Sequence, residues 1–157
     1  MLKRLNPVHA AAYDSYETAR RPSCFENTHT ELLNTVTNWI HDERRRRIYI
    51  LYGIAGIGKS TVAKTVAEQA AMNRVLGSSF FFSRNEDNRK TAKSFFQTLA
   101  YHLAHRYSEL SVRINEVLEE DRDVAQRNPR KQFGLLIAKP LQSIRAGHNP
   151  ILIISTH

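Results

Sequence analysis

The chain has 157 residues, a formal net charge of +8 at pH 7 and a single cysteine, Cys24. Its hydrophobic content of 41%, with 9% aromatic residues, is typical of a globular protein and excludes disorder along the whole chain. One cysteine excludes an internal disulfide, and no apolar run approaches the roughly 20 residues that span a bilayer, so we expect one modest cytoplasmic domain with no membrane partner.

The first part of the chain has a segment without apolar periodicity, followed by a segment with a clear helical periodicity. Residues 1–27 show no periodicity, so we expect a flexible leader or linker before the domain at 28–157. Thr28 or Thr30 is the candidate N-cap of a first helix, with Glu31 in its first turn. One face of this helix carries a repeating apolar set: Leu32, Leu33, Val36, Trp39 and Ile40.

A positively charged connector follows this helix. Its densest part is the run Arg44–Arg47, which raises the question of a nucleic-acid partner. Four consecutive arginines cannot share one helical face, and no aromatic residues alternate with them to stack on bases. We therefore interpret the run as a solvated connector rather than a nucleic-acid site. Contact with another polyanion or a membrane surface is the alternative.

The next three elements form one motif. The apolar run 48–52 predicts a buried strand, and the apolar spacing over 59–72 predicts a helix. They flank the pattern G-x-x-x-x-G-K-[ST] of a phosphate-binding loop, in which glycines let backbone N–H groups turn toward phosphate oxygens. The residues that we expect to hold the nucleotide are Gly53, Ile54, Ala55, Gly56, Ile57, Gly58, Lys59, Ser60 and Thr61.

Two residues of the loop have specific expected roles. Lys59 should reach the β- and γ-phosphates, and the Ser60 hydroxyl should ligate Mg²⁺. The first turn of the following helix adds its positive dipole end. The sequence thus predicts binding of ATP or GTP with Mg²⁺, without deciding between the two bases. A glycine-rich turn that binds nothing is the alternative.

The rest of the chain alternates strands and helices. The expected elements are a strand at 79–82, a strong helix over 92–107, a weaker helix around 109–120, helical turns over 133–144 interrupted at Pro140, and a third strand at 151–154. Strands alternating with helices predict an α/β fold with a parallel sheet between helical layers. His102, His105 and His148 show no metal-ligand spacing, so we interpret them as surface histidines.

Several blocks together resemble the NACHT class of signal-transduction ATPases, in the fungal group with the nephrocystin 3-like N-terminal domain. In their order and spacing these blocks cover residues 24–154, and the phosphate-loop block is residues 52–61. The other blocks are Cys24 with Thr28, the helix ending in Trp39, 77–84, 98–101 with Leu103, 132–133, 136–137 and 140–141. The resemblance implies a three-layer P-loop NTPase fold and an ATP- or GTP-binding switch for signal transduction or assembly. It also implies self-association, or attached effector or repeat domains in a longer parent.

The chain departs from this family at two places. His29 stands where the family commonly carries arginine. The third strand runs into Ser155, Thr156 and His157, where the family carries the acidic Walker B residues that hold Mg²⁺ and help to activate water. We therefore expect an N-terminal part of a NACHT domain, truncated at this strand, with no catalytic residue and no hydrolysis. A catalytic ATPase or GTPase and a non-functional truncated product are the alternatives.

Overall fold

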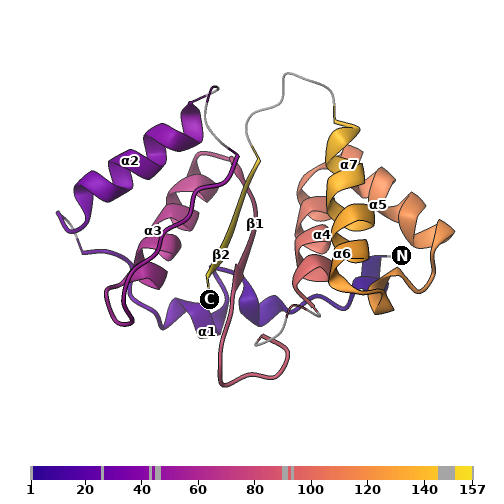
Figure 1. The fold of residues 1–157 in the computed structure, drawn as a ribbon, viewed down its shortest axis with the longest axis horizontal. Coiled ribbons are helices and arrows are strands. Elements are labelled where there is room, and N and C mark those ends of the chain that lie inside the picture. Colours follow the sequence, from indigo (N-terminus) through magenta and orange to yellow (C-terminus); the bar gives the residue numbers. More distant parts are fainter. Residues whose placement is uncertain are drawn as a thin grey trace.

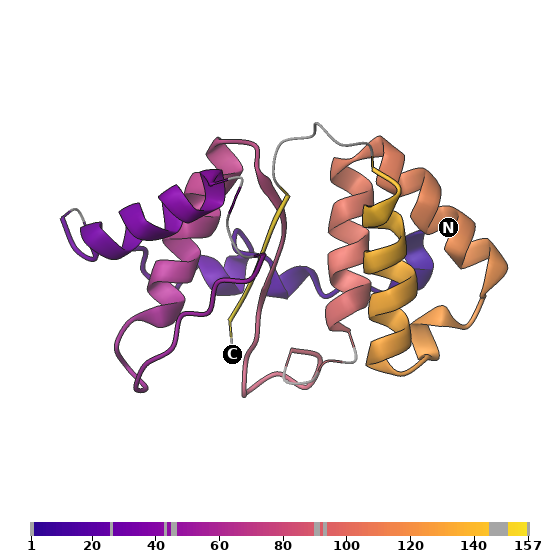
Figure 2. The same cartoon turned by 45° about the horizontal axis from the view of Figure 1, so that its top comes forward.

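The computed structural model describes residues 2–25, 27–42, 44, 47–89, 92, 94–144 and 151–156. Two parallel strands, β1 (Leu76–Phe81) and β2 (Leu152–Thr156), form a small sheet. Helices lie on both sides of it (Figures 1 and 2), with α3 (Lys59–Met72) packed on one side and α4 (Phe95–Arg106) on the other. The mixed helix and strand composition and the parallel pairing agree with the predicted α/β class.

Strand β1 is buried along its whole length, as its apolar sequence predicts, and begins three residues earlier than expected. Its register pairs Leu76 with Leu152 and Phe80 with Ser155, with an irregularity at Gly77. A Cβ on Gly77 would collide with the Ile151 side chain and come within 3.0 Å of Leu103. Glycine at this position therefore allows α4 and the start of β2 to approach the strand closely.

The helices before β1 follow the predicted positions. Helix α2 (Thr30–His41) has Glu31 in its first turn, and α3 has the predicted bounds. The predicted threonine cap is wrong. The N-cap residue is His29, whose backbone is left-handed and whose side chain makes no capping bond, while the Thr28 hydroxyl donates to Phe25 O at 2.7 Å.

The helices after β1 form the second group. Helix α5 (Ser108–Glu120) follows α4, and a long helical segment then runs through α6 (Pro129–Gln132), the π-helical turn η4 (Phe133–Ala138) and α7 (Lys139–Gln142). The predicted interruption at Pro140 is wrong, because Pro140 lies in the first turn of α7, where a proline is tolerated, and the helical segment continues through it after the π-helical turn. Wider π-type hydrogen bonding is one way for a helix to accommodate a local irregularity.

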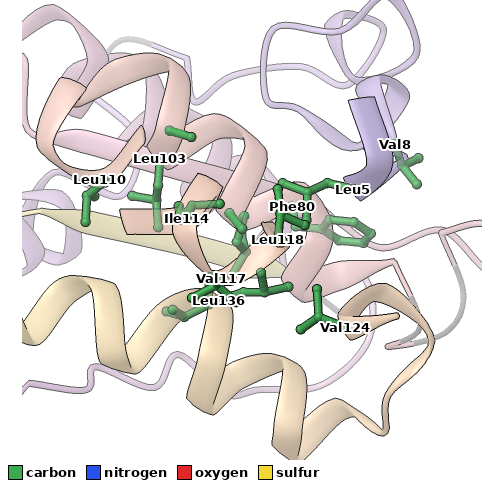
Figure 3. Packing of buried hydrophobic residues seen from close by; sticks show 14 of the residues in the cluster. Leu5, Val8, Phe80, Leu103, Leu110, Ile114, Val117, Leu118, Val124 and Leu136 are labelled. Carbon is green, nitrogen blue, oxygen red and sulfur yellow. The ribbon is translucent and has the colours of Figure 1, made fainter. Parts of the chain in front are cut away.

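The hydrophobic core consists of two clusters. The larger one lies among α4, α5, η4 and the N-terminal residues, and its fully buried members include Leu5, Phe80, Leu103, Leu110, Ile114 and Leu136 (Figure 3). The smaller one joins α2, α3 and the start of β1 through Val36, Ile40, Val62, Val66, Ala67 and Leu76. The two clusters lie on opposite sides of the small sheet.

The N-terminal segment contributes to the larger cluster. It forms two short 3₁₀ helices, η1 (Leu2–Leu5) and η2 (His9–Ala11), and the single turn α1 (Tyr16–Ala19). Leu5 and Ala11 are fully buried, and the backbone N–H of Val8 donates to Thr98 Oγ1 at 3.0 Å. The segment that we expected to be a flexible leader thus packs against α4. Its sequence has no apolar periodicity, so this packing could not be predicted from the sequence. The boundary at residue 27 stays a prediction.

The predicted strand at 48–52 is not formed. These residues run as an extended segment from α2 to the loop (Figure 1), and the Ile48, Ile50 and Tyr52 side chains are 75%, 73% and 88% exposed. A strand needs a hydrogen-bonded neighbour. One edge of β2 pairs with β1, and its other edge does not pair with residues 48–52. Residues 48–52 therefore have strand composition without strand pairing.

A half-buried imidazole links α4 to β1. His102 Nδ1 lies 2.9 Å from Ser78 Oγ, so the prediction of a surface histidine is wrong for this residue. Burial lowers the pKa of His102 below its usual value, the charges of His9 and His105 lower it further, and Asp14 opposes the shift. The exposed His105 fits the surface prediction, and His148 lies outside the described residues.

This shift predicts a pH-dependent stability. Because the pKa of His102 is lower in the folded state, the unfolded chain binds more protons once the pH falls below about 6.5. The free energy of unfolding should therefore decrease with falling pH until the folded-state pKa is passed, by at most about 1.4 kcal/mol per pH unit. Urea unfolding of wild type and His102→Gln between pH 5 and 8 measures it.

The variant should show a flatter pH dependence than wild type, whatever its absolute stability. His41→Gln, at the exposed end of α2, is the control and should keep the wild-type slope. Equal slopes for wild type and His102→Gln would contradict the assignment.

Candidate functional site

The loop Gly53–Gly58 lies on the surface between the extended segment and α3. Gly56 and Gly58 have φ angles of 84° and 90°, a left-handed conformation that residues with a Cβ rarely adopt. A Cβ on Gly53 would come within 3.3 Å of Ile57 Cγ2, which is a tight contact. Of the two glycines of the sequence pattern, Gly58 therefore stands where the backbone conformation favours glycine, and Gly53 where a Cβ would be a tight fit.

Lys59 folds back over this loop. Its ammonium group donates to Gly53 O at 2.8 Å and to Ile54 O at 2.7 Å. None of the described ion pairs involves Lys59. Lys59, which we expect to bind phosphate, thus donates to two carbonyl oxygens. Among the described residues it has no carboxylate partner that would neutralise its charge.

The start of α3 holds the other predicted ligands. Gly58 is the N-cap residue and its carbonyl accepts from Val62 N at 3.0 Å, so Lys59, Ser60 and Thr61 form the first turn. The first N–H groups of a helix have no partner within the helix, and the helix dipole is positive at this end. The half-buried Ser60 hydroxyl and these N–H groups are therefore a fitting environment for an anion.

A cavity of about 550 Å³ lies beside this turn. Lys59 and Ser60 line it from α3, Trp39 lines it from α2, and residues of the extended segment and of β2 form the remaining walls. The Trp39 and Tyr49 rings contact each other with centroids 5.3 Å apart. The structure thus places the lysine and the serine of the loop on one concavity.

The end of β2 lies on the same cavity. Ser155 and Thr156 line it, at the position where the resemblance leads one to expect acidic residues, and His157 lies outside the described residues. In the part of the chain that the structure describes, no three His, Cys, Asp or Glu side chains gather as metal ligands. Ser60, in the first turn of α3, has a hydroxyl of the kind that can ligate Mg²⁺.

Two contacts near the loop were missed by sequence analysis. The first is His29, whose Nε2 lies 3.6 Å from the point where a Cβ on Gly58 would be. The second is the attachment of the N-terminal segment to α3: the buried Lys64 donates to Arg21 O at 2.5 Å, and Thr65 Oγ1 accepts from Cys24 N at 2.9 Å. Lys64 lies off the apolar stripe of its helix, so periodicity gives no sign of its burial.

Arg89 is a buried charged residue that sequence analysis did not single out. It is 2% exposed, and its guanidinium donates twice to Phe81 O, at 3.0 and 2.8 Å, and to Glu86 Oε1 at 2.7 Å. Arg89 therefore satisfies the carbonyl at the end of β1. It stabilises the fold and lies outside the cavity beside the loop.

Comparison with models of known protein families finds a match. The family model described as nephrocystin 3, N-terminal, matches residues 27–155, a range that includes α2, the loop, α3 and most of β2. No curated protein and no solved structure matches the chain. Within the described residues, none of the helices has the length and apolar character needed to cross a bilayer.

Proposed function

The chain belongs to the nephrocystin 3 N-terminal family, and from this we propose that it binds a nucleoside triphosphate, ATP or GTP with Mg²⁺, at residues 53–61 as a NACHT-type switch module. One observation carries the proposal. The Lys59 ammonium lies over a loop whose Gly56 and Gly58 have the left-handed conformation that turns backbone N–H groups toward a phosphate.

The residues present fit a triphosphate by their donor chemistry. Lys59 would exchange its bonds to Gly53 O and Ile54 O for bonds to phosphate oxygens, which carry more charge and are stronger acceptors. The N–H groups of the first turn of α3 and the loop backbone supply further donors. Mg²⁺, held through the Ser60 hydroxyl, would supply positive charge between the phosphates.

The partners of this switch are part of the proposal. Ile48, Ile50, Tyr52 and Ile54 form an exposed apolar stretch that leads into the loop. Exposed apolar stretches of this kind favour contact with another protein surface. We therefore propose self-association, or contact with an attached effector or repeat domain, as the output of nucleotide binding. Cys24 as the sole cysteine fits a reducing compartment, so the proposal places the protein in the cytoplasm.

Nucleotide binding should raise the thermal stability of the protein. A ligand that binds only the folded state, present at 100 times its dissociation constant, adds about 2.7 kcal/mol to the free energy of unfolding. We expect Mg-ATP, Mg-GTP or both to raise the melting temperature in a concentration-dependent way, and AMP, which lacks the β- and γ-phosphates, to have a much smaller effect. Absence of any shift with both triphosphates, together with no heat of binding in calorimetry, would contradict the proposal.

A further inference from the structure

The cavity that Lys59 and Ser60 line also has an aromatic part. Trp39 of α2 and Tyr49 of the extended segment both line it. Their rings contact each other with centroids 5.3 Å apart and planes inclined by 59°. Among the described residues around the cavity, these two are the ones with aromatic rings. One concavity thus joins the residues expected to bind phosphate with an aromatic pair.

The separation of these two parts suits an extended nucleotide. Tyr49 lies four residues before Gly53, in the segment that runs from the end of α2 to the loop (Figure 1). Four extended residues span at most about 14 Å. On the α3 side, Lys59 and Val66 both line the cavity, about 10 Å apart along the helix. A nucleoside triphosphate has a comparable length from its γ-phosphate to its base.

The aromatic pair is not covered by the fold. Tyr49 is 36% exposed, Trp39 is half-buried, and no strand pairing of residues 48–52 with β2 closes this side of the cavity. A nucleobase is a flat aromatic ring, and every base has a π-face that stacks on aromatic side chains. The cavity volume of about 550 Å³ is also in the usual range for small-molecule sites.

We infer that the base of the bound triphosphate stacks on Trp39, with Tyr49 as the second wall of the base site. This inference rests on the proposed function and assigns the base-binding residues of that site. Stacking uses the face of the base rather than its edge, so it holds adenine and guanine alike. The nucleotide then lies along the cavity and contacts α2, the extended segment and α3 together.

Trp39 is the sole tryptophan of the chain, so tryptophan fluorescence reports on this ring alone. The test titrates wild type with Mg-ATP, Mg-GTP and Mg-tripolyphosphate, which has the phosphate chain without a base, and records both emission and heat of binding. Both nucleotides should change the emission and should bind about fivefold or more tighter than tripolyphosphate, as stacking of one base predicts. Tripolyphosphate should leave the emission unchanged.

Two variants each remove one ring and keep an apolar side chain in the cavity. Affinity for the nucleotides should fall about fivefold or more in Trp39→Leu and in Tyr49→Leu, while affinity for tripolyphosphate stays within about twofold of wild type. Trp39→Phe keeps an aromatic face and should retain most of the nucleotide affinity. Tyr49 lies outside the paired strands, so its variant keeps the test decisive where Trp39→Leu fails to fold.

The matched control is Tyr16→Leu, because Tyr16 is 71% exposed in α1 and does not line the cavity, and it should bind as wild type does. If wild type binds nucleotides and tripolyphosphate equally tightly, or a folded variant without either ring keeps the wild-type nucleotide affinity, the inference is overturned and the proposed function stands. Equal losses in Trp39→Phe and Trp39→Leu would also overturn it, because an aromatic face would not be what binds. If wild type binds neither nucleotide, the proposed function itself fails.

Discussion

Replacing Lys59 with alanine or methionine should reduce the affinity of the protein for Mg-ATP or Mg-GTP at least tenfold. The change removes a charge-assisted contact worth about 1.5–3 kcal/mol, and methionine does so while keeping a long unbranched stem. In the structure the ammonium bonds only to the loop carbonyls Gly53 O and Ile54 O among the described contacts, so the folded state should lose little stability. Isothermal calorimetry on wild type and both variants measures the effect.

The control for this experiment is Lys139→Met. Lys139 lies in α7, its side chain is 64% exposed, and its partner Glu120 is 3.9 Å away on the surface. The loss of one positive charge there should leave nucleotide affinity unchanged. If Lys59→Met binds as tightly as wild type, the loop is not the nucleotide site.

Replacing Leu5 with alanine should destabilise the protein by about 2–5 kcal/mol, the usual cost of truncating a fully buried leucine. Leu5 is 0% exposed and lies in the larger core cluster with Phe80 and Leu118 (Figure 3). Removing its side chain leaves a cavity between the N-terminal segment and α4. The measurement is the free energy of unfolding from urea denaturation, and Lys3→Ala, at an exposed position of the same short helix, is the control.

This prediction decides between two views of the N-terminal segment. A change below about 0.5 kcal/mol, the usual range for a surface substitution, would mean that the segment is a flexible leader, as the sequence suggests. A large change would make it part of the folded unit that carries the loop.

The sequence predicts those elements whose pattern is local. The spacing of apolar residues predicts α3 with its bounds and α5 within a residue, because one face of each helix is buried. Short apolar runs predicted β1, which is buried along its length, and β2, which is mostly half-buried. The sequence pattern requires glycine at residue 58, and its φ angle of 90° is one that a residue with a Cβ rarely adopts.

Features that depend on contacts between distant segments were not predicted. Residues 48–52 have the composition of a strand, but strand pairing depends on the neighbouring edge. The burial of Arg89 depends on the carbonyl of Phe81, and that of Lys64 on the carbonyls of Ala19 and Arg21. The position of His29 against Gly58 likewise depends on how α2 packs against α3.

The parallel pairing of β1 with β2 also has a consequence for the order in which we expect the chain to fold. Leu76 pairs with Leu152, and α4, α5 and the α6–α7 helix lie between them in the sequence. The entropy of closing this long loop is lost before the first hydrogen bond between the strands forms, which makes such pairing intrinsically slow. The helices form from local contacts and come first. We therefore expect sheet formation to be a late step of folding, with the edge of β1 open to other chains until β2 pairs with it.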